Sequence, residues 1–373
     1  MIIGVPKEIK NHEYRVGMVP ASVRELVNHG HQVLVETDAG MGIGFTNDDY
    51  VQAGAEILAT PADVFAKAEM IIKVKEPQAI ERAMLREDQI LFTYLHLAPD
   101  LPQTEDLVKS KAICIAYETV TDSRGGLPLL APMSEVAGRM SIQAGAQALE
   151  KINKGSGMLL GGVPGVEPAK VVIIGGGMVG RSAALMAVGL GANVVILDRN
   201  IDVLRALDAQ FGNKVRAIYS TADALEKHVL EADLVIGGVL IPGAAAPKLV
   251  TAAHIKAMKP GSAIVDVAID QGGCIATSKA TTHADPTFIV DDVVHYCVAN
   301  MPGAVPRTST FALNNATLPF IINLANKGYK KALLDDAHFL KGLNVIKGQV
   351  TYKEVAEAFN MEYVDPRTAL ENV

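Results

Sequence analysis

Short apolar runs of strand length recur along the chain and alternate with segments of helical periodicity. The runs are almost continuously apolar, as in MIIKVK, ILFTYL, KVVIIG and AIVDVAI. Between most of them lie amphipathic segments such as PASVRELVNHG and TPADVFAKAEM. Strands that are apolar on both faces and alternate with helices are typical of parallel sheets covered on both sides. The pattern predicts an α/β fold made of doubly wound parallel sheets.

The length of the chain and one Gly/Pro-rich stretch predict two domains. A chain of 373 residues exceeds the usual size of a single core, and residues 155–170 are rich in Gly and Pro just before a new strand. Long helical segments near 134–152 and 308–326 flank the central part, and the second carries Pro319, where we expect a kink. The expected division is a Rossmann domain of residues 131–307 inserted into a discontinuous domain of residues 1–130 plus 308–373.

Composition and charge exclude several classes of partner. The net charge is −7 with both signs mixed along the chain, which disfavours nucleic acid as a ligand. No apolar run is long enough to span a bilayer, and the first residues lack the apolar core of a signal peptide. The three cysteines form no CxxC pair, and no HExxH or Cys/His cluster is present. We therefore expect a cytoplasmic protein with neither a membrane segment nor a metal site.

A glycine-rich turn provides the strongest motif. Gly175, Gly177 and Gly180 form GxGxxG directly after the strand KVVIIG and before a helix. The first glycine permits the tight turn, the second lets the backbone approach a pyrophosphate, and the third lets the helix pack close to the sheet. Asp198 ends the next strand, 23 residues beyond Gly175, where a carboxylate can bind the adenosine ribose. These features predict a dinucleotide site that prefers NAD to NADP, a preference that Arg199 tempers without reversing.

Later strands of the same unit contribute to the expected cofactor crevice. Ligands of doubly wound sheets lie outside the carboxyl ends of the strands, which places Ser220, the backbone of Val239 and Leu240, and Asp270 along the crevice. Asp266 and Asp270 would share one face of the strand AIVDVAI, with only Asp270 at its end. Position alone leaves two interpretations of Asp270 open, a functional carboxylate or a turn-capping aspartate.

A dehydrogenase also needs groups that hold the substrate and move a proton, because the cofactor takes only the hydride. Arg15, in KNHEYRVGMVP, could bind a substrate carboxylate through both of its terminal nitrogens, or it could be a solvated loop arginine. Lys73 and Lys75 would share one face of the strand MIIKVK, so both must escape burial or find partners. Lys75 lies nearer the carboxyl end and is the better candidate for a cleft.

His96 closes the strand ILFTYLHLAP, just before a loop. A histidine at the end of an interior strand is suited to acid/base catalysis, whereas the alternative is a core histidine bonded to a carbonyl. Met133 and Ser134 stand at the mouth of the first long helix and could face the cofactor, although a serine at a helix start is often only a cap.

Long segments of the chain resemble the alanine dehydrogenases, a family to which the α subunit of nicotinamide nucleotide transhydrogenase is related. The resemblance rests on segments that run nearly from end to end, among them GVPKEIKNHEYRV, IIKVKEP, ILFTYLHLA, LPLLAPMSEVAGR, VDVAIDQGG and YCVANMPGAVPRTST. It implies two α/β domains, a homohexamer, and NAD-dependent oxidation of L-alanine to pyruvate and ammonia, with the reverse amination.

The same resemblance assigns roles to residues. It implies that His96 and Asp270 are catalytic and that Arg15 and Lys75 bind the substrate. Val203 stands where some members carry a basic residue, which leaves a charge contact to the adenosine half in doubt. The implied cofactor-binding set is Met133, Ser134, Gly175, Gly177, Met178, Val179, Gly180, Asp198, Ser220, Val239, Leu240, Val267, Ala268, Ile269, Asp270, Lys279, Val298, Ala299, Asn300 and Met301.

The implied mechanism is hydride transfer from the alanine Cα, followed by attack of water on the imine. His96 would move the proton of the carbinolamine oxygen, Lys75 would polarise that oxygen and Arg15 would hold the carboxylate. Asp270 would act on the water from the other domain, so the chemistry would depend on domain closure. Two alternatives are a transhydrogenase subunit, which has no amino-acid substrate, and a regulator that binds NAD without catalysis.

Overall fold

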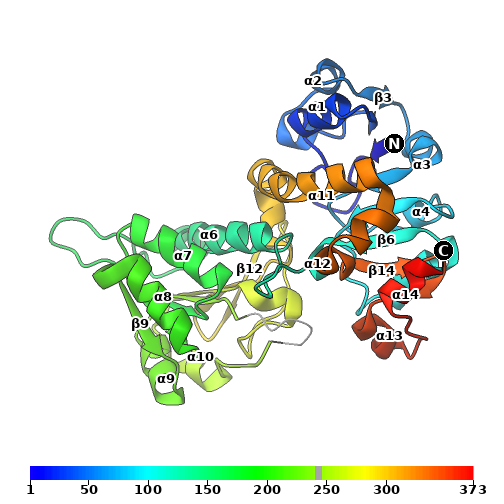
Figure 1. Ribbon diagram of the computed structural model, residues 1–373. Helices are drawn as coiled ribbons and strands as arrows, with labels where there is room; N and C mark the ends of the chain where they lie inside the picture. Colours follow the sequence, from blue (N-terminus) through cyan, green and yellow to red (C-terminus); the bar gives the residue numbers. More distant parts are fainter. Residues whose placement is uncertain (240–245, 373) are drawn as a thin grey trace. The chain divides into compact units, whose positions relative to one another are not determined.

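The computed structural model describes residues 1–239 and 246–372, and the chain divides into two compact units (Figure 1). Unit 1 combines Met1–Met133 with Val305–Val373, and unit 2 is Ser134–Ala304. The boundaries expected from the sequence are 130/131 and 307/308. Both chain ends belong to unit 1, whereas unit 2 is continuous in sequence.

Unit 1 is built on one sheet with eight strands in its described residues, in the order β15-β14-β6-β5-β4-β1-β2-β3. The strands are β1 (Ile2–Val5), β2 (Gln32–Glu36), β3 (Glu56–Leu58), β4 (Met70–Ile72), β5 (Ile90–Thr93), β6 (Ile113–Ala116), β14 (Leu343–Ile346) and β15 (Gln349–Val350). All pair in parallel except β14, which runs antiparallel to β6 and β15. The direction of winding reverses between β1 and β4, the position at which open α/β sheets bind ligands.

The helices of unit 1 connect these strands and cover the sheet (Figure 1). They are α1 (Pro20–Asn28), α2 (Asn47–Gln52), α3 (Pro61–Lys67), α4 (Ala79–Arg82), α5 (Leu101–Ser110), α11 (Pro306–Leu334), α12 (Ala337–Leu340), α13 (Lys353–Phe359) and α14 (Pro366–Glu371), with 3-10 turns η1 (Met41–Ile43) and η2 (Tyr117–Thr119). Several begin with proline in the first turn, where its missing N–H costs no hydrogen bond.

Unit 2 contains a second sheet, with seven strands in the part of the chain described, in the order β12-β13-β11-β10-β7-β8-β9. The strands are β7 (Lys170–Ile174), β8 (Asn193–Asp198), β9 (Val215–Tyr219), β10 (Leu234–Gly237), β11 (Ala263–Asp266), β12 (Thr287–Val290) and β13 (Val293–Tyr296). Only β12 is antiparallel to its neighbour. The α/β prediction is confirmed, and the antiparallel strands at one edge of each sheet add to it.

The helices of unit 2 follow the expected alternation with strands. They are α6 (Ala131–Ala148), which begins in unit 1, α7 (Met178–Gly189), α8 (Ile201–Phe211), α9 (Ala222–Leu230) and α10 (Ala252–Ala257), with 3-10 turns η3 (Lys151–Asn153), η4 (Gly212–Lys214), η5 (Val267–Gln271) and η6 (Met301–Ala304). Strand β7 explains the continuous apolar pattern, because Val171 and Ile173 enter one core cluster and Val172 and Ile174 enter another. Both faces of this strand are therefore buried.

Helix α6 packs closely against α7, and the two run side by side in Figure 1. A Cβ atom at Gly138 would lie 2.3 Å from the carbonyl oxygen of Val179, so only glycine fits at this crossing. The small residues of SEVAGRMSIQAGAQALEKIN thus have a packing role. Among the residues that the structure describes, no helix is both long and apolar enough to cross a lipid bilayer.

Helix α11 returns the chain to unit 1 and is tied to the first residues of the sequence. Asn314 Oδ1 accepts hydrogen bonds from the amide of Val19 at 3.0 Å and from Ser22 Oγ at 2.6 Å, and its Nδ2 donates to the carbonyl of Gly17 at 3.2 Å. Asn314 is buried, so these bonds are made away from water and fix the helix against the segment that precedes α1.

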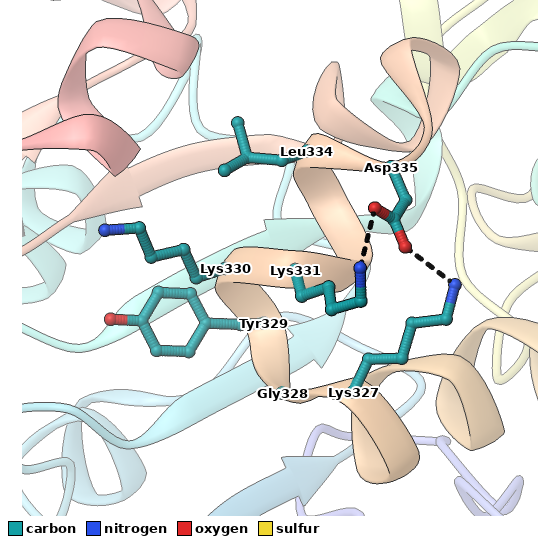
Figure 2. Close-up of a pocket in the computed structure, with 7 residues that line it drawn as sticks. All are labelled: Lys327, Gly328, Tyr329, Lys330, Lys331, Leu334 and Asp335. Atoms are coloured by element: carbon teal, nitrogen blue, oxygen red, sulfur yellow. Dashed lines mark hydrogen bonds and ion pairs between the residues drawn. The ribbon is translucent and has the colours of Figure 1, made fainter.

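The interruption of α11 lies at Gly328 rather than at Pro319, where the sequence predicted a kink. Gly328 has φ 74° and ψ 157°, which are not helical, and it is the one described residue inside the helix with such angles. Asp335 accepts from Lys327 at 2.9 Å across the break and from Lys331, which lies on its own side of the break, at 3.3 Å (Figure 2). The pocket at this break contains none of the residues that the sequence singled out.

Candidate active site

Two lysines follow β4, and they have different surroundings. The strand ends at Ile72, so the predicted strand MIIKVK is too long and the lysines lie in the loop beyond it. Lys73 is fully buried, with Nζ 3.0 Å from Glu8 Oε2 and 2.7 Å from Glu81 Oε1. Lys75 keeps 13% of its side chain exposed. Lys73 therefore belongs to a buried ion cluster, and Lys75 is the lysine that a ligand can reach.

The ion cluster also holds the backbone that presents Lys75. Glu8 Oε1 accepts hydrogen bonds from the amides of Val74 at 2.6 Å and Lys75 at 3.3 Å. Burial raises the pKa of Glu8. Burial alone would lower the pKa of Lys73, but the carboxylates of Glu8 and Glu81 outweigh it and the pKa of Lys73 is raised. Lys73 stays charged in the core, and Glu8, its partner, fixes the backbone of the loop after β4.

His96 lies in the loop after β5, which ends at Thr93, so the predicted strand is again too long. Its side chain is 46% exposed, which is inconsistent with a buried core histidine. The ring stacks on Tyr94 at 5.7 Å between centroids, and Nδ1 lies 3.9 Å from Glu76 Oε2. The imidazole is thus held over an aromatic face and open to a small ligand.

Glu76 connects the two candidate groups. Its Oε2 lies 3.5 Å from Lys75 Nζ and 3.9 Å from His96 Nδ1, while Oε1 accepts from Lys10. Burial would raise the pKa of this carboxyl, but the ammonium groups of Lys75 and Lys10 and the hydrogen bond from Lys10 lower it to about 2. Glu76 is therefore an anion at neutral pH, the counter-ion of Lys75 and a neighbour of the His96 ring.

Arg15 is buried rather than solvated, with only 2% of it exposed. Arg15 donates from Nε at 2.7 Å and from Nη2 at 2.6 Å to the two carboxylate oxygens of Glu13, and its Nη1 lies 3.2 Å from Met133 Sδ. Burial opposes the charge, but the hydrogen bonds to Glu13 raise the pKa of Arg15. The guanidinium is thus a fixed cation whose plane is set by Glu13. Ser134 follows in the interior of α6, so it is not the helix cap.

The glycine turn of unit 2 has the geometry of a phosphate-binding loop. Gly175 has φ 98°, and a Cβ there would lie 2.9 Å from the carbonyl oxygen of Gly238, so two loops meet closely at the winding reversal between β7 and β10. A Cβ at Gly180 would lie 1.8 Å from the carbonyl oxygen of Gly175. A Cβ at Gly177 would meet nothing within 4 Å, which leaves open space in front of the start of α7.

Asp198 ends β8 beside this turn. Its Oδ2 accepts from the amide of Gly176 at 2.7 Å and its Oδ1 accepts from the amide of Asn200 at 2.7 Å. Each carboxylate oxygen can still accept a second hydrogen bond, so Asp198 can anchor the turn and accept hydrogen bonds from a ribose diol at the same time. The amide of Ser220 donates to the carbonyl of Asp198 at 2.9 Å, which brings the end of β9 to the same edge.

Asp270 is exposed and lies beyond β11, not on it. The strand ends at Asp266, and residues 267–271 form the 3-10 turn η5, so the expectation that Asp266 and Asp270 share one strand face is wrong. Asp266 is fully buried and accepts from the amides of Cys274 at 3.3 Å and Ile275 at 3.2 Å. Asp270 Oδ1 accepts from the amide of Asn300, 30 residues away, at 3.3 Å. The loop-holding carboxylate is therefore Asp266.

The other predicted cofactor residues have varied environments within unit 2. Lys279 lies over the ring of Phe288, with Nζ 4.5 Å from the centroid. Met178, at the start of α7, is exposed. Leu240 lies outside the described residues. The buried members are Val179, Ala268, Ile269, Val298 and Met301, and the partly buried members are Val239, Val267 and Ala299.

Three carboxylates at the edge of the unit 1 sheet were missed from the sequence. Glu76 follows Lys75 directly in KVKEP and could have been noticed as its counter-ion. Glu8 is 66 residues from Val74 and Glu118 is 22 residues from His96, and nothing in the sequence links either acid to these partners. Their contacts depend on which strands become neighbours.

The arrangement fits the predicted ligands within each unit. In unit 1 Lys75 and His96 both face Glu76, and the charge of Arg15 interacts with Tyr94, whose ring stacks on His96. A cation and an imidazole in this arrangement suit an anionic substrate with a transferable proton. In unit 2 the uncapped start of α7, the open space at Gly177 and the carboxylate of Asp198 fit a dinucleotide. Among the described residues, no three His, Cys, Asp or Glu side chains gather as metal ligands.

Comparisons with known proteins agree across the whole chain. Residues 4–137 match the family model "Alanine dehydrogenase/PNT, N-terminal domain", and residues 141–353 match "Alanine dehydrogenase/PNT, C-terminal domain". The chain is 61% identical over 365 residues to the alanine dehydrogenase of Halomonas elongata, covering 98% of both chains. It is 57% identical over 371 residues to that of Methanococcus maripaludis, covering 99% of this chain and 100% of the relative. A solved structure of an L-alanine dehydrogenase superimposes with a TM-score of 0.94 at 54% identity, over 96% of this chain and 99% of the other.

Proposed function

The chain belongs to the alanine dehydrogenase/PNT family, and from this membership we propose that it catalyses the NAD-dependent oxidative deamination of L-alanine to pyruvate and ammonia, and the reverse amination. The observation that carries the proposal is the arrangement at the edge of the unit 1 sheet, where Lys75 and His96 both approach Glu76. A site that only binds a nucleotide has no need of an imidazole for proton transfer beside an ammonium that binds the substrate.

Arg15 and Lys75 are proposed to bind the substrate. The guanidinium of Arg15 attracts the substrate carboxylate, and its ion pair with Glu13 keeps the group from rotating. Lys75 adds a second positive charge beside it and stabilises negative charge on the oxygen of the reacting carbon. Since Glu8 holds the backbone amide of Lys75, this ammonium starts from a defined position.

His96 and Asp270 are proposed to move protons. NAD, when bound in unit 2, supplies the acceptor for the hydride of the alanine Cα. The imidazole of His96 takes the proton from the carbinolamine oxygen as ammonia leaves, and it returns that proton in the amination direction. Asp270 orients the water that attacks the imine. The remaining members of the cofactor set named from the sequence are proposed to bind the dinucleotide.

The decisive experiment measures NADH formation at 340 nm from L-alanine and NAD at alkaline pH. We expect turnover with L-alanine and none without an amino acid. A rise with another amino acid but not with alanine would redirect the substrate assignment. Hydride exchange between two nucleotides without any amino acid would identify a transhydrogenase, and cofactor binding without any turnover would identify a regulator.

We also propose that the enzyme acts in the cytoplasm as a homohexamer, without nucleic acid or membrane partners. Unit 2 exposes several large apolar side chains that an assembly would cover, namely Ile152, Leu159, Val163 and Val166. Light scattering coupled to size exclusion tests this: a particle of one chain's mass, 39.5 kDa, would contradict it.

A further inference from the structure

The backbone of His96 has an unusual conformation that something must hold. Its φ is 49°, in the left-handed region that residues other than glycine rarely adopt. Such residues persist only where the surroundings over-determine them, and they cluster at functional sites. His96 lies in a loop with half of its side chain in solvent, so the packing of its ring does not supply the whole constraint.

The carboxylate of Glu118 supplies that constraint. Glu118 lies in η2, directly after β6, the neighbour of β5 in the sheet. Its Oε1 accepts from the amide of His96 at 2.6 Å and from the amide of Leu95 at 3.1 Å, and its Oε2 lies 3.2 Å from the latter. Two successive amides that point to one anion form a concave cradle, and hydrogen bonds to a charged acceptor are among the stronger ones in proteins.

The opposite side of the same peptide is held as well. Gln103 Nε2 donates to the carbonyl of Leu95 at 2.5 Å, and both residues are fully buried. The peptide unit between Leu95 and His96 is therefore bound through the amide of His96 and the carbonyl of Leu95, and the preceding amide, that of Leu95, is bound as well. The left-handed turn is fixed by side chains from η2 and α5.

We propose that Glu118 is a positioning residue for His96, which it holds in the left-handed conformation that places the imidazole beside Glu76 and Lys75. This inference rests on the proposed role of His96 in alanine oxidation. Glu118 binds neither substrate nor cofactor in this scheme and acts only through the backbone of Leu95 and His96. Without its charge the loop relaxes toward ordinary backbone angles and the imidazole leaves its place.

The neighbouring candidate is presented in the same way, which supports the assignment. Glu8, from the segment after β1, accepts from the amides of Val74 and Lys75 just as Glu118 accepts from those of Leu95 and His96. In both cases the acid follows the strand next to the one that precedes the candidate residue. Glu118 is the better test, because it is only partly buried and has no buried lysine that depends on it.

The first test compares Glu118→Gln with Glu105→Gln, which makes the same change at an exposed position on α5. Glutamine keeps the shape of the side chain, but its amide group offers one acceptor oxygen in place of two. We expect kcat of Glu118→Gln to fall about tenfold or more, because small misplacements of catalytic groups have effects of this size. Its affinity for NAD and its thermal unfolding should match those of Glu105→Gln. An unchanged kcat would overturn the proposal.

The second test asks whether Glu118 acts through His96. In a His96→Ala background, the residual rate should change by less than about twofold when Glu118→Gln is added, because the group to be positioned is gone. A purely structural role for Glu118 would lower the rate by the same factor in both backgrounds, and that result would overturn the proposal.

The third test does not depend on the activity. Amide hydrogen exchange should become about tenfold faster or more at Leu95 and His96 in Glu118→Gln, with other amides of β5 and β6 unchanged. Unchanged protection at these two amides would overturn the inference even if wild-type enzyme oxidises alanine. If the wild-type chain forms no NADH from alanine, the proposed function fails, whereas the exchange measurement still decides whether Glu118 holds this loop.

Discussion

The imidazole Nδ1 of His96 lies 3.9 Å from Oε2 of Glu76, and the same carboxylate oxygen lies 3.5 Å from the ammonium of Lys75. Two candidate groups for proton transfer and substrate binding therefore share one anion. A substitution of Glu76 should affect both of them at once, although the residue itself was not suggested by the sequence.

Replacing Glu76 by Gln should lower kcat/KM for L-alanine by about tenfold or more, because the charge that orients Lys75 and His96 is removed while the side-chain shape is kept. Steady-state kinetics at saturating NAD provide the measurement, with Glu105→Gln as the control. Wild-type values of kcat/KM in Glu76→Gln would contradict the shared role.

The same variant should alter the dependence of stability on pH. The pKa of Glu76 is lowered from 4.5 to about 2 in the folded protein, so its ion pairs stabilise the fold above pH 4.5 and are lost as the pH falls toward 2. Between pH 4.5 and 2, the free energy of unfolding measured in urea should therefore fall by about 1–3 kcal/mol more for the wild type than for Glu76→Gln. Parallel curves for the two proteins would contradict the ion-pair assignment.

His96→Ala and Asp270→Asn should each lower kcat by roughly 10²–10⁴-fold, the usual contribution of a positioned acid or base. Affinity for NAD should change little in His96→Ala, because that residue lies in unit 1. Turnover within a few-fold of wild type, together with normal NAD binding, would show that the proposed roles are wrong.

Lys73→Met should destabilise the protein by about 3–5 kcal/mol, because Glu8 and Glu81 are then left buried without their cation. Adding Glu8→Gln and Glu81→Gln should recover part of this loss. Lys75→Met, at the neighbouring lysine, should cost less than Lys73→Met, because Glu76 keeps Lys10 as a second cation. Denaturant unfolding measures all three; equal losses for the two lysine variants would contradict the distinction between them.

Alanine substitutions at two glycines of the fingerprint should affect different properties, cofactor affinity at Gly177 and stability at Gly180. Gly177→Ala should fold like wild type but bind NADH about tenfold or more weakly, since its Cβ enters only the space reserved for the phosphates. Gly180→Ala should be destabilised, because its Cβ would lie 1.8 Å from a backbone carbonyl oxygen. NADH fluorescence and thermal unfolding separate these effects, and normal NADH affinity in Gly177→Ala would argue against the loop as a phosphate site.

Asp198→Asn should shift the preference from NAD toward NADP by about tenfold in relative affinity, because the change removes repulsion of a 2′-phosphate and keeps an acceptor for the amide of Gly176. Calorimetric titration with both cofactors measures the ratio. An unchanged ratio would mean that another residue sets the preference.

Strand alternation and the glycine fingerprint were readable in the sequence because both are local. An apolar strand, a glycine turn and an acid at the next strand end appear within about 30 residues, as in any βαβ unit. The ends of strands were not readable in this way. ILFTYLHLAP continues past Thr93 because Tyr94 and Leu95 are buried in the loop, and MIIKVK continues past Ile72 because Lys73 and Val74 are buried in theirs.

The supports of the candidate site were the least predictable part. Lys73 and Lys75 are chemically identical and alternate with apolar residues in the same way, so the sequence does not distinguish them. The positions of Glu8 and Glu81 decide which lysine is buried. The contact of Glu118 with His96 likewise depends on β5 and β6 being neighbours. Such partners follow from topology, which propensity and periodicity do not encode.

The interruption of unit 1 by unit 2 has a consequence for synthesis on the ribosome. Strand β6 leaves the ribosome early, but its outer partner β14 begins at Leu343, after the whole of unit 2 has been translated. Until then β6 is an uncovered edge strand, which is prone to pair with other chains. All strands of unit 2 are translated before residue 305, so its sheet can be completed before β14 is synthesised. The nascent chain thus passes through a stage in which unit 2 is complete and the sheet of unit 1 is still open at one side.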